Sequence, residues 1–144
     1  MTPGPAGFSR RMRLLRPLEF SRVYDTRQSA SAGPLVLYAA AHRANPDGVR
    51  VGLSVSRRIG SAVVRNRWKR RLREAFRQIR GSLPSGNDFV IVVRSGEPPA
   101  GEAGAREMET AIAALAARVV GRRGYADAVP RPRGDAAAKP KRRR

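Results

Sequence analysis

The sequence of 144 residues contains no cysteine and only one histidine, His42. Without cysteine there is neither a disulfide framework nor a thiolate zinc site. A lone histidine near the end of an expected strand is far more often a surface residue than a catalyst. The chain also has no HExxH motif, no Ser/His/Asp signature and no Gly-rich phosphate loop of the required spacing. These absences exclude the common hydrolytic and zinc-dependent sites.

Acidic residues are scarce too, with 11 Asp and Glu against 30 Lys and Arg. A nuclease that works alone needs a carboxylate cluster for metal ions or an acid–base pair. No two acids here form a compact motif such as DxD or ExxH. Glu107 and Glu109 are two positions apart on an expected helix, so they do not face each other. We therefore expect no catalytic and no metal-binding residues in this chain.

Long apolar runs are missing as well. No run approaches the roughly 18 residues of a membrane span, and no apolar signal-peptide core follows the N-terminal arginines. The Arg- and Ser-containing start imitates a mitochondrial transit peptide, but it leads straight into the expected fold. We expect a cytoplasmic protein with no membrane partner.

Positive charge is abundant: the net charge is +19 and the isoelectric point is about 11.9. Such a chain binds a polyanion, which would be RNA, DNA or, less favoured, an anionic membrane surface. Residues 121–144 account for +7 of this charge, so +12 remains on residues 1–120. The part expected to fold is therefore basic in its own right, although charge alone does not choose the polyanion.

The charge is concentrated in residues 57–80, where ten residues are Arg or Lys and only Glu74 is acidic. At about 100° per residue, the apolar side chains fall on one arc of a helix: Val64, Trp68, Leu72, Ala75, Phe76 and Ile79. The opposite arc is basic: Asn66, Lys69, Arg70, Arg73, Arg77 and Arg80. Like charges four residues apart repel each other. A solvated surface usually mixes signs, so this pattern favours nucleic-acid contact.

Hydrophobic periodicity and turn signals predict one domain with two basic extensions. The predicted elements are a mobile basic arm over 1–16, a helix over 17–27, a loop over 30–34, strands over 35–41, 49–56 and 88–94, helices over 61–80 and 107–120, a loop over 95–104, and a disordered basic tail over 121–144. Ser61 is the expected N-cap of the basic helix. Gly81 and Pro84 are its expected stop.

The turn signal Asn45-Pro46-Asp47-Gly48 predicts that the first two strands form a hairpin with one buried and one polar face. A helix joins the second strand to the third, which suggests that these two strands are parallel. We therefore expect an α/β (α+β) two-layer sandwich, with a small mixed sheet, a central basic helix and one core. Phe20, Tyr24 and Tyr38 could stack unpaired bases, at roughly 1–3 kcal/mol each.

The segment SVSRRIGSAVVRNRWKRRLREAFR, residues 54–77, resembles the signature of the protein subunit of bacterial ribonuclease P. That pattern is S-x-S-[KR]-[KR]-x-G-x-A-V-x-R-N-x-x-K-R-x-x-R-E. The segments LEFSRVYD, LVLY and NDFVIVVR resemble the family's first helix, first long strand and late strand. The resemblance covers roughly residues 14–120. It implies the ribosomal protein S5 domain 2-like fold with a left-handed βαβ crossover, where general rules would predict a right-handed one.

The resemblance also implies a function. In the family, the protein binds a large catalytic RNA, and the holoenzyme, an endoribonuclease, removes the 5′ leader of precursor tRNA. The RNA holds the catalytic Mg²⁺, so the protein alone would bind no cofactor and require no protein partner. The implied contacts to the catalytic RNA are Arg57, Arg58, Arg65, Asn66, Arg67, Lys69, Arg70 and Arg73. The implied leader-binding cleft is lined by Phe20, Tyr24, Tyr38 and Ser54.

The chain departs from the family pattern in two places. The family usually has a glycine soon after the first helix, which Asp25-Thr26-Arg27-Gln28 lacks, and the basic C-terminal tail is not part of the pattern. Two other functions remain open: a ribosomal or RNA-chaperone protein of similar shape, and a DNA-binding protein. The RN-x-x-KR pattern beside an aromatic helix favours the ribonuclease P subunit over both. The lack of helix-turn-helix spacing or zinc ligands weakens the DNA-binding one.

Overall fold

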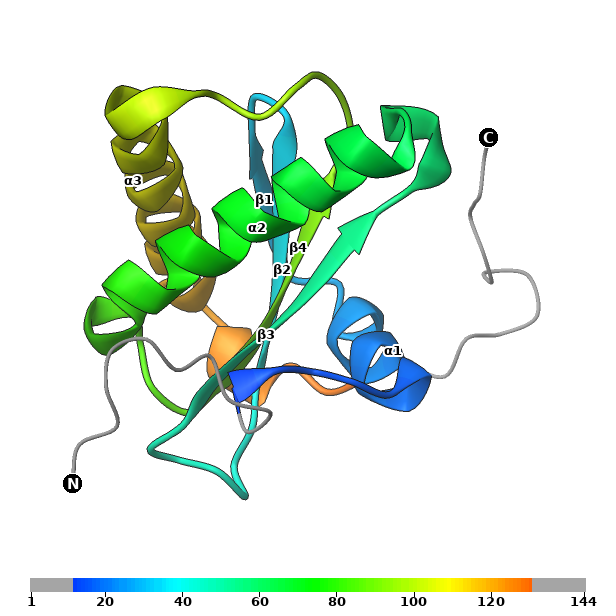
Figure 1. Cartoon of the computed structure of the whole chain (residues 1–144). Coiled ribbons are helices and arrows are strands. Elements are labelled where there is room, and N and C mark those ends of the chain that lie inside the picture. Colours follow the sequence, from blue (N-terminus) through cyan, green and yellow to red (C-terminus); the bar gives the residue numbers. More distant parts are fainter. Residues whose placement is uncertain (1–11, 131–144) are drawn as a thin grey trace, which may run out of the picture.

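The structure, a computed structural model, describes residues 12–130 (Figure 1). The first eleven residues of the predicted arm and residues 131–144 of the predicted tail lie outside the described part. The helices are α1 (Pro17–Asp25), α2 (Ala62–Ile79) and α3 (Gly101–Val120), and the strands are β1 (Ser29–Ala32), β2 (Leu35–Ala41), β3 (Val49–Val55) and β4 (Asn87–Val93). Short 3₁₀ turns are η2 (Arg57–Ile59), η3 (Arg80–Ser82) and η4 (Tyr125–Asp127). Within residues 12–130, the helices are too short or too polar to cross a membrane.

The four strands form one mixed sheet in the order β1-β2-β4-β3. β4 pairs antiparallel with β2 and parallel with β3, which confirms the predicted parallel pair across the helix. The predicted hairpin of β2 and β3 is wrong, because β4 lies between them. The turn at Asn45 does form, with Gly48 N–H donating to the Asn45 carbonyl at 3.1 Å. It reverses the chain but connects strands that are not neighbours.

The stretch predicted as a loop over 30–34 is also different, because β1 occupies Ser29–Ala32 and pairs antiparallel with β2. Small residues can form a short edge strand when the neighbouring strand supplies the hydrogen bonds. The last helix begins at Gly101 rather than 107, with Gly104 packed against Pro99. The central helix and its Ser61 N-cap are as predicted: the Ser61 Oγ accepts from Val64 N–H at 3.3 Å.

Helices cover both faces of the sheet, and α3 and α1 lie on opposite sides of it (Figure 1). α2 and α3 pack over the larger cluster, which includes Trp68, Phe76, Phe89, Ile91, Ile112 and Leu115. α1 covers a smaller cluster built on Leu14, Val23, Ala40 and Val90. The α+β class, the mixed sheet and the central basic helix are confirmed. The short helix α1 adds a partial third layer, and each face has its own cluster instead of one shared core. The hand of the crossover remains a prediction.

The folded part extends beyond both predicted boundaries. Arg13 forms a parallel bridge with Val51, and Leu14 N–H donates to the Val51 carbonyl at 3.0 Å, so this segment lies along the outer edge of β3. Leu14 is buried. At the other end, Tyr125 is only 3% exposed and its hydroxyl donates to Asn87 Oδ1 at 2.6 Å. The described contacts therefore reach from residue 13 to η4, beyond the predicted domain bounds of 17 and 120.

Candidate nucleic-acid interface

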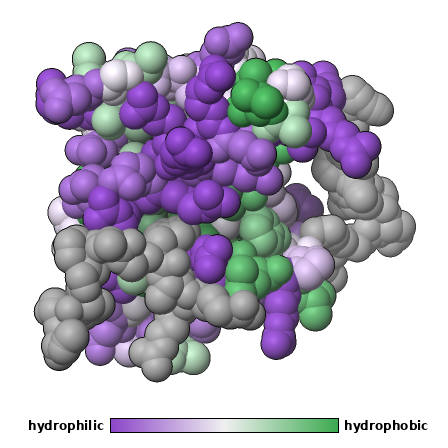
Figure 2. Space-filling model, in the orientation of Figure 1, coloured by the Kyte–Doolittle hydropathy of each residue, from purple (hydrophilic) through white to green (hydrophobic). Residues whose placement is uncertain are grey.

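The predicted RNA contacts lie on η2 and on the outer side of α2, and we call them the basic face. They are Arg57, Arg58, Arg65, Asn66, Arg67, Lys69, Arg70 and Arg73. Figure 2 shows hydrophilic side chains gathered over α2. Arg65 and Lys69 are half-buried at the edge of this face, and the other six residues are exposed. The structure therefore brings all eight together on one side of the molecule.

The buried side of α2 fixes how the basic face is presented. Trp68, Leu72 and Phe76 are fully buried against the sheet and α3, as the predicted apolar stripe requires. The Trp68 indole N–H also donates to the Gly96 carbonyl at 3.0 Å. Because a helix with one face packed in this way cannot rotate about its axis, the cations on the opposite face are held toward solvent.

Most charge on the basic face is uncompensated. Glu74, the one acid of α2, pairs with Arg77 and accepts a bond from Gln78 at 3.4 Å, and these contacts lower its pKa. Within residues 12–130, none of the arginines of the basic face, nor Lys69, forms an ion pair. Arg65 is partly engaged within the protein, because its Nε donates a hydrogen bond to the Gly60 carbonyl at 3.2 Å. The face thus offers unpaired guanidinium groups suited to phosphates.

The residues predicted to line the cleft are also brought together, on the opposite face of the sheet. The rings of Tyr24 and Tyr38 meet edge to face, with centroids 4.9 Å apart. Burial raises the pKa of the Tyr24 phenol, against a hydrogen bond with Ser54 that lowers it. Phe20 lies on Gly52, where an added Cβ would sit 2.6 Å from the ring. We call Phe20, Tyr24, Tyr38 and Ser54 the aromatic cluster.

Beside this cluster, α1 leaves part of the sheet uncovered. The strand register places Ser31, Val36, Val92 and Ser54 in one row across β1, β2, β4 and β3. Ser31 is exposed and the other three are half-buried, whereas in the next row Val90 and Gly52 are buried under α1. This uncovered row, the open floor, has two hydroxyls flanking two apolar side chains. The sequence pattern does not place Ser31, Val36 and Val92 in the site, because it predicts a loop at β1 and a fully interior β4.

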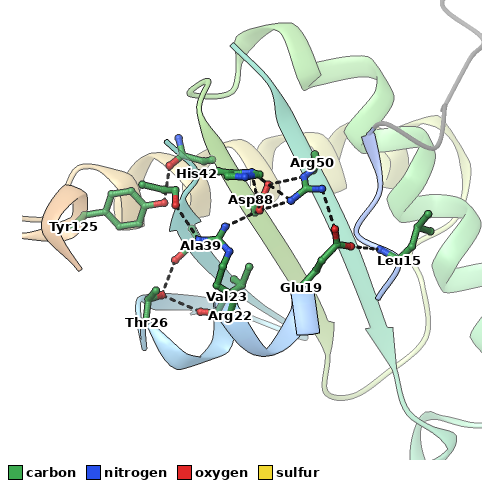
Figure 3. A network of polar contacts seen from close by, with 12 residues as sticks. Leu15, Glu19, Arg22, Val23, Thr26, Ala39, His42, Arg50, Asp88 and Tyr125 are labelled. Carbon is green, nitrogen blue, oxygen red and sulfur yellow. Dashed lines mark hydrogen bonds and ion pairs between the residues drawn. The ribbon is translucent and has the colours of Figure 1, made fainter. Parts of the chain in front are cut away.

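A network of charged groups fixes α1 to the sheet (Figure 3). The Asp88 carboxylate, 1% exposed, accepts two hydrogen bonds from Arg50, at 2.9 and 2.8 Å, and one from Arg22 on α1 at 2.7 Å. His42 Nδ1 lies 3.4 Å from the same carboxylate. Arg50 also binds Glu19 of α1, at 3.1 Å. Since Phe20 and Tyr24 lie on the same helix as Glu19 and Arg22, this network sets the position of the aromatic cluster.

The network shifts the acidity of its carboxyl groups. Burial alone would raise the pKa of Asp88, but the hydrogen bonds and charges of Arg50 and Arg22 outweigh burial and hold the pKa below its usual value. Glu19 behaves in the same way, because backbone N–H groups of Leu15 and Arg16 and the charge of Arg50 outweigh burial and lower its pKa. The pKa of Arg50 is raised, first of all by its hydrogen bonds to Asp88. The carboxyl groups of Asp88 and Glu19 are therefore ionised at neutral pH.

The missing glycine after the first helix has a structural counterpart. α1 ends at Asp25, and Arg27 takes a left-handed conformation with φ of 60°. Thr26 is buried, and its hydroxyl lies 2.9 Å from the Val23 carbonyl and 3.1 Å from that of Ala39, within hydrogen-bond distance of both. An arginine therefore stands in a backbone conformation that favours glycine. The hydrogen bonds of Thr26, and that from Arg27 N–H to the Tyr24 carbonyl, hold the turn between α1 and β1.

The described acids are dispersed. In residues 12–130, no group of three or more His, Cys, Asp or Glu side chains is arranged to hold a metal ion. Glu19, Glu74 and Asp88 are each paired with arginine. The described surface offers groups suited to binding: cations for phosphates on one side, and aromatic rings and hydroxyls on the other.

Comparison with known proteins places this geometry in a family. The family model Ribonuclease P matches residues 8–120. The ribonuclease P protein component of Chloroflexus aggregans is 46% identical over 85 residues, covering 59% of this chain and 62% of the relative. That of Bacillus cereus is 42% identical over 76 residues, covering 53% and 65%. The matched stretch thus spans less than two thirds of these two curated relatives.

A solved structure agrees with the sequence matches. The RNase P protein of Staphylococcus aureus superposes with a TM-score of 0.58 at 25% identity, covering 72% of this chain and 91% of that one. The superposition supports the mixed sheet and its helices, and the family model spans the described domain from the N-terminal segment to the end of α3. On these grounds, the chain belongs to the Ribonuclease P family.

Proposed function

We propose that this chain is the protein subunit of a ribonuclease P holoenzyme that acts in the cytoplasm. In this proposal the basic face binds the catalytic RNA. The aromatic cluster and the open floor bind the single-stranded 5′ leader of precursor tRNA. The protein assists the endonucleolytic cut that frees the mature 5′ end, and it requires no protein partner for this role. The carrying observation is the basic face: its arginines and Lys69 form no ion pair among the described residues.

The division of labour follows from the chemistry of each side. Arginine and lysine contact phosphates without reading sequence, which suits a large folded RNA. Aromatic rings stack unpaired bases irrespective of their identity, which suits a leader of variable sequence. Ser31 and Ser54 offer hydroxyls to the sugar-phosphate backbone at the margins of the open floor. The sheet separates the two sides, so one protein can hold both RNAs at once.

The cut itself is assigned to the RNA. Phosphodiester hydrolysis of this kind uses Mg²⁺ to activate water and stabilise the leaving oxygen. We assign these ions to the catalytic RNA, because the described acids are dispersed or neutralised by arginine. The protein's contribution is then to hold the substrate near the RNA active site and to neutralise phosphate repulsion between the two RNAs.

Reconstitution tests the proposal. The full chain is mixed with a bacterial ribonuclease P RNA and a precursor tRNA at near-physiological Mg²⁺, and leader removal is compared with that by RNA alone. We expect faster cleavage and tighter substrate binding with the protein. No gain in either quantity would reject the subunit assignment and favour a general RNA-binding protein.

Substrate length tests the leader site separately. Phe20→Ala should weaken binding of substrates with long leaders and leave leaderless tRNA unaffected, because only the leader would meet the aromatic cluster. Equal loss for both substrates would reject the leader site while leaving the basic face intact. A parallel Val63→Ala variant changes an exposed apolar residue on α2 and controls for loss of apolar surface.

A further inference from the structure

Arg27 combines an unfavourable backbone with an uncommitted charge. It is the one residue other than glycine with a positive φ in residues 12–130. A Cβ disfavours this left-handed conformation, which glycine adopts freely. Because the backbone alone would favour glycine, an arginine at this position suggests that its side chain has a role of its own.

The position of Arg27 is fixed relative to the aromatic cluster. Its N–H donates to the Tyr24 carbonyl at 3.0 Å. The next residue, Gln28, accepts from Ala39 N–H at 3.0 Å, and Ser29 pairs directly with Tyr38. The Arg27 backbone therefore lies beside both tyrosines, at the β1 end of the sheet face that carries the open floor.

The charge of Arg27 is available to a ligand. The residue is exposed, and within the described chain its guanidinium makes no hydrogen bond and no ion pair. Two other arginines on this side are committed instead, Arg22 and Arg50 to Asp88. An unpaired arginine next to a pair of aromatic residues is a combination that can bind single-stranded nucleic acid, with rings for the bases and a cation for the phosphates.

We propose that Arg27 binds a phosphate of the single-stranded leader whose bases stack on Tyr24 and Tyr38, and so favours substrates with leaders long enough to reach it. The planar guanidinium fork can hold two phosphate oxygens at once. This inference rests on the proposed function, because it names a further contact of the same leader site. The Arg27 contact adds a requirement that base stacking does not impose: the leader must be long enough to reach the guanidinium.

Three substitutions separate charge from backbone. Arg27→Gln removes the charge and keeps the strained backbone, Arg27→Lys keeps the charge without the fork, and Arg27→Gly removes the charge and relieves the backbone. The matched control is Arg106→Gln, an equal charge change at an exposed position of α3, on the other side of the sheet. Each full-length variant is assembled with ribonuclease P RNA. The dissociation constants for long-leader precursor and leaderless tRNA are then measured across a salt series.

For long leaders, we expect Arg27→Gln and Arg27→Gly to weaken binding about three- to fivefold and to reduce the salt slope by about 0.7. Arg27→Lys should retain most of the affinity, and leaderless tRNA should bind all variants equally. Arg27→Gly should also melt at a higher temperature than the wild type. Weaker binding from a more stable protein could not be attributed to misfolding.

The contrary outcomes are distinguishable. If the wild type prefers long leaders and Arg27→Gln preserves that preference, the Arg27 contact is rejected and the leader site stands. An equal loss in Arg106→Gln would assign the effect to net charge and also reject the contact. If the wild type itself does not distinguish leader lengths, the proposed leader site fails, and the Arg27 contact fails with it.

Discussion

Arg50 of β3 and Asp88 of β4 pair directly across two parallel strands, and two hydrogen bonds of 2.9 and 2.8 Å join the guanidinium to the carboxylate. The same guanidinium reaches Glu19 on α1 at 3.1 Å. One side chain therefore links two strands and a helix. Because the helix carries Phe20 and Tyr24, the geometry of the proposed leader site depends on an ion pair that would itself touch no RNA.

Removing the central carboxylate should cost much of the protein's stability. In Asp88→Asn, Arg22 and Arg50 would lose the charge that compensates them in a buried setting, and breaking such a pair costs about 3–5 kcal/mol. Urea denaturation monitored by Trp68 fluorescence measures the loss. Glu107→Gln, an exposed acid on α3, is the control and should change stability by less than about 0.5 kcal/mol. A small loss in both would mean that the network is not a major source of stability.

The same network predicts acid sensitivity. The pKa of Asp88 and that of Glu19 are lowered in the folded state. A lowered folded-state pKa gives stability that is present above the unfolded pKa, near 4, and is lost as the pH falls through the folded value. Urea midpoints should therefore be steady from about pH 7 to about pH 5 and decline below about pH 4. Asp88→Asn should show a shallower decline, and an unchanged decline would exclude Asp88 as its source.

The basic face predicts a change in salt dependence. Arg73→Gln should weaken binding to ribonuclease P RNA and reduce the slope of log affinity against log salt by about one. Arg73 is preferred to Arg65 here because Arg65 also bonds to the Gly60 carbonyl, so its removal would disturb the start of α2. Filter binding across a salt series measures the slope. Arg106→Gln on α3 is the control, and an identical slope change there would mean that the protein attracts RNA by net charge alone.

Two glycines provide a matched test of the Phe20 position. In Gly52→Ala the new methyl group would meet the Phe20 ring at 2.6 Å, so the ring and α1 must shift, at a cost of about 1–3 kcal/mol. Gly81→Ala places the same methyl group in open space. We expect lower thermal stability and weaker long-leader binding for Gly52→Ala only. If Gly52→Ala is destabilised but binds long-leader substrates normally, Phe20 does not contact the leader.

Tyr125 predicts that the C-terminal segment stabilises the domain. Tyr125→Phe removes the hydroxyl bonded to Asn87 and should cost about 1–2 kcal/mol, because a buried amide oxygen loses its donor. Truncation after residue 130 should leave the melting temperature unchanged, whereas truncation after Gly121 should lower it by more than Tyr125→Phe does. Equal melting temperatures for the two truncations would show that η4 adds nothing.

Local patterns predicted every described helix and strand except β1, and also the parallel pair of β3 and β4, but not the place of β4 between β2 and β3. The stripe from Val64 to Ile79 and the cap at Ser61 act within a few residues, so the sequence shows them directly. The place of β4 depends on contacts between residues far apart: Leu37 with Ile91, and Leu53 with Ile91. No local signal distinguishes a hairpin from two strands that admit a third between them.

The candidate sites also differ in whether local sequence predicts them. The basic face follows from composition and helical spacing, and the aromatic cluster from an i,i+4 pair on α1. The open floor could not be predicted, because it exists only where α1 stops short of the row through Val36 and Val92. Tyr125 did leave a signal, since it is the only aromatic residue after Phe89. It stands in a stretch whose Pro, Gly and Arg content suggests disorder.

The place of β4 has a consequence for how the chain is made. Of the described strands, β4 is synthesised last although it lies inside the sheet, so β2 and β3 each keep one edge unpaired until it is made. Such non-local and parallel pairing forms slowly. The arginines of α2 leave the ribosome before the strand that completes the sheet beneath them. We therefore expect the nascent chain to be most exposed to stray RNA and to aggregation at this point, and its safe synthesis to depend on how quickly residues 80–93 follow.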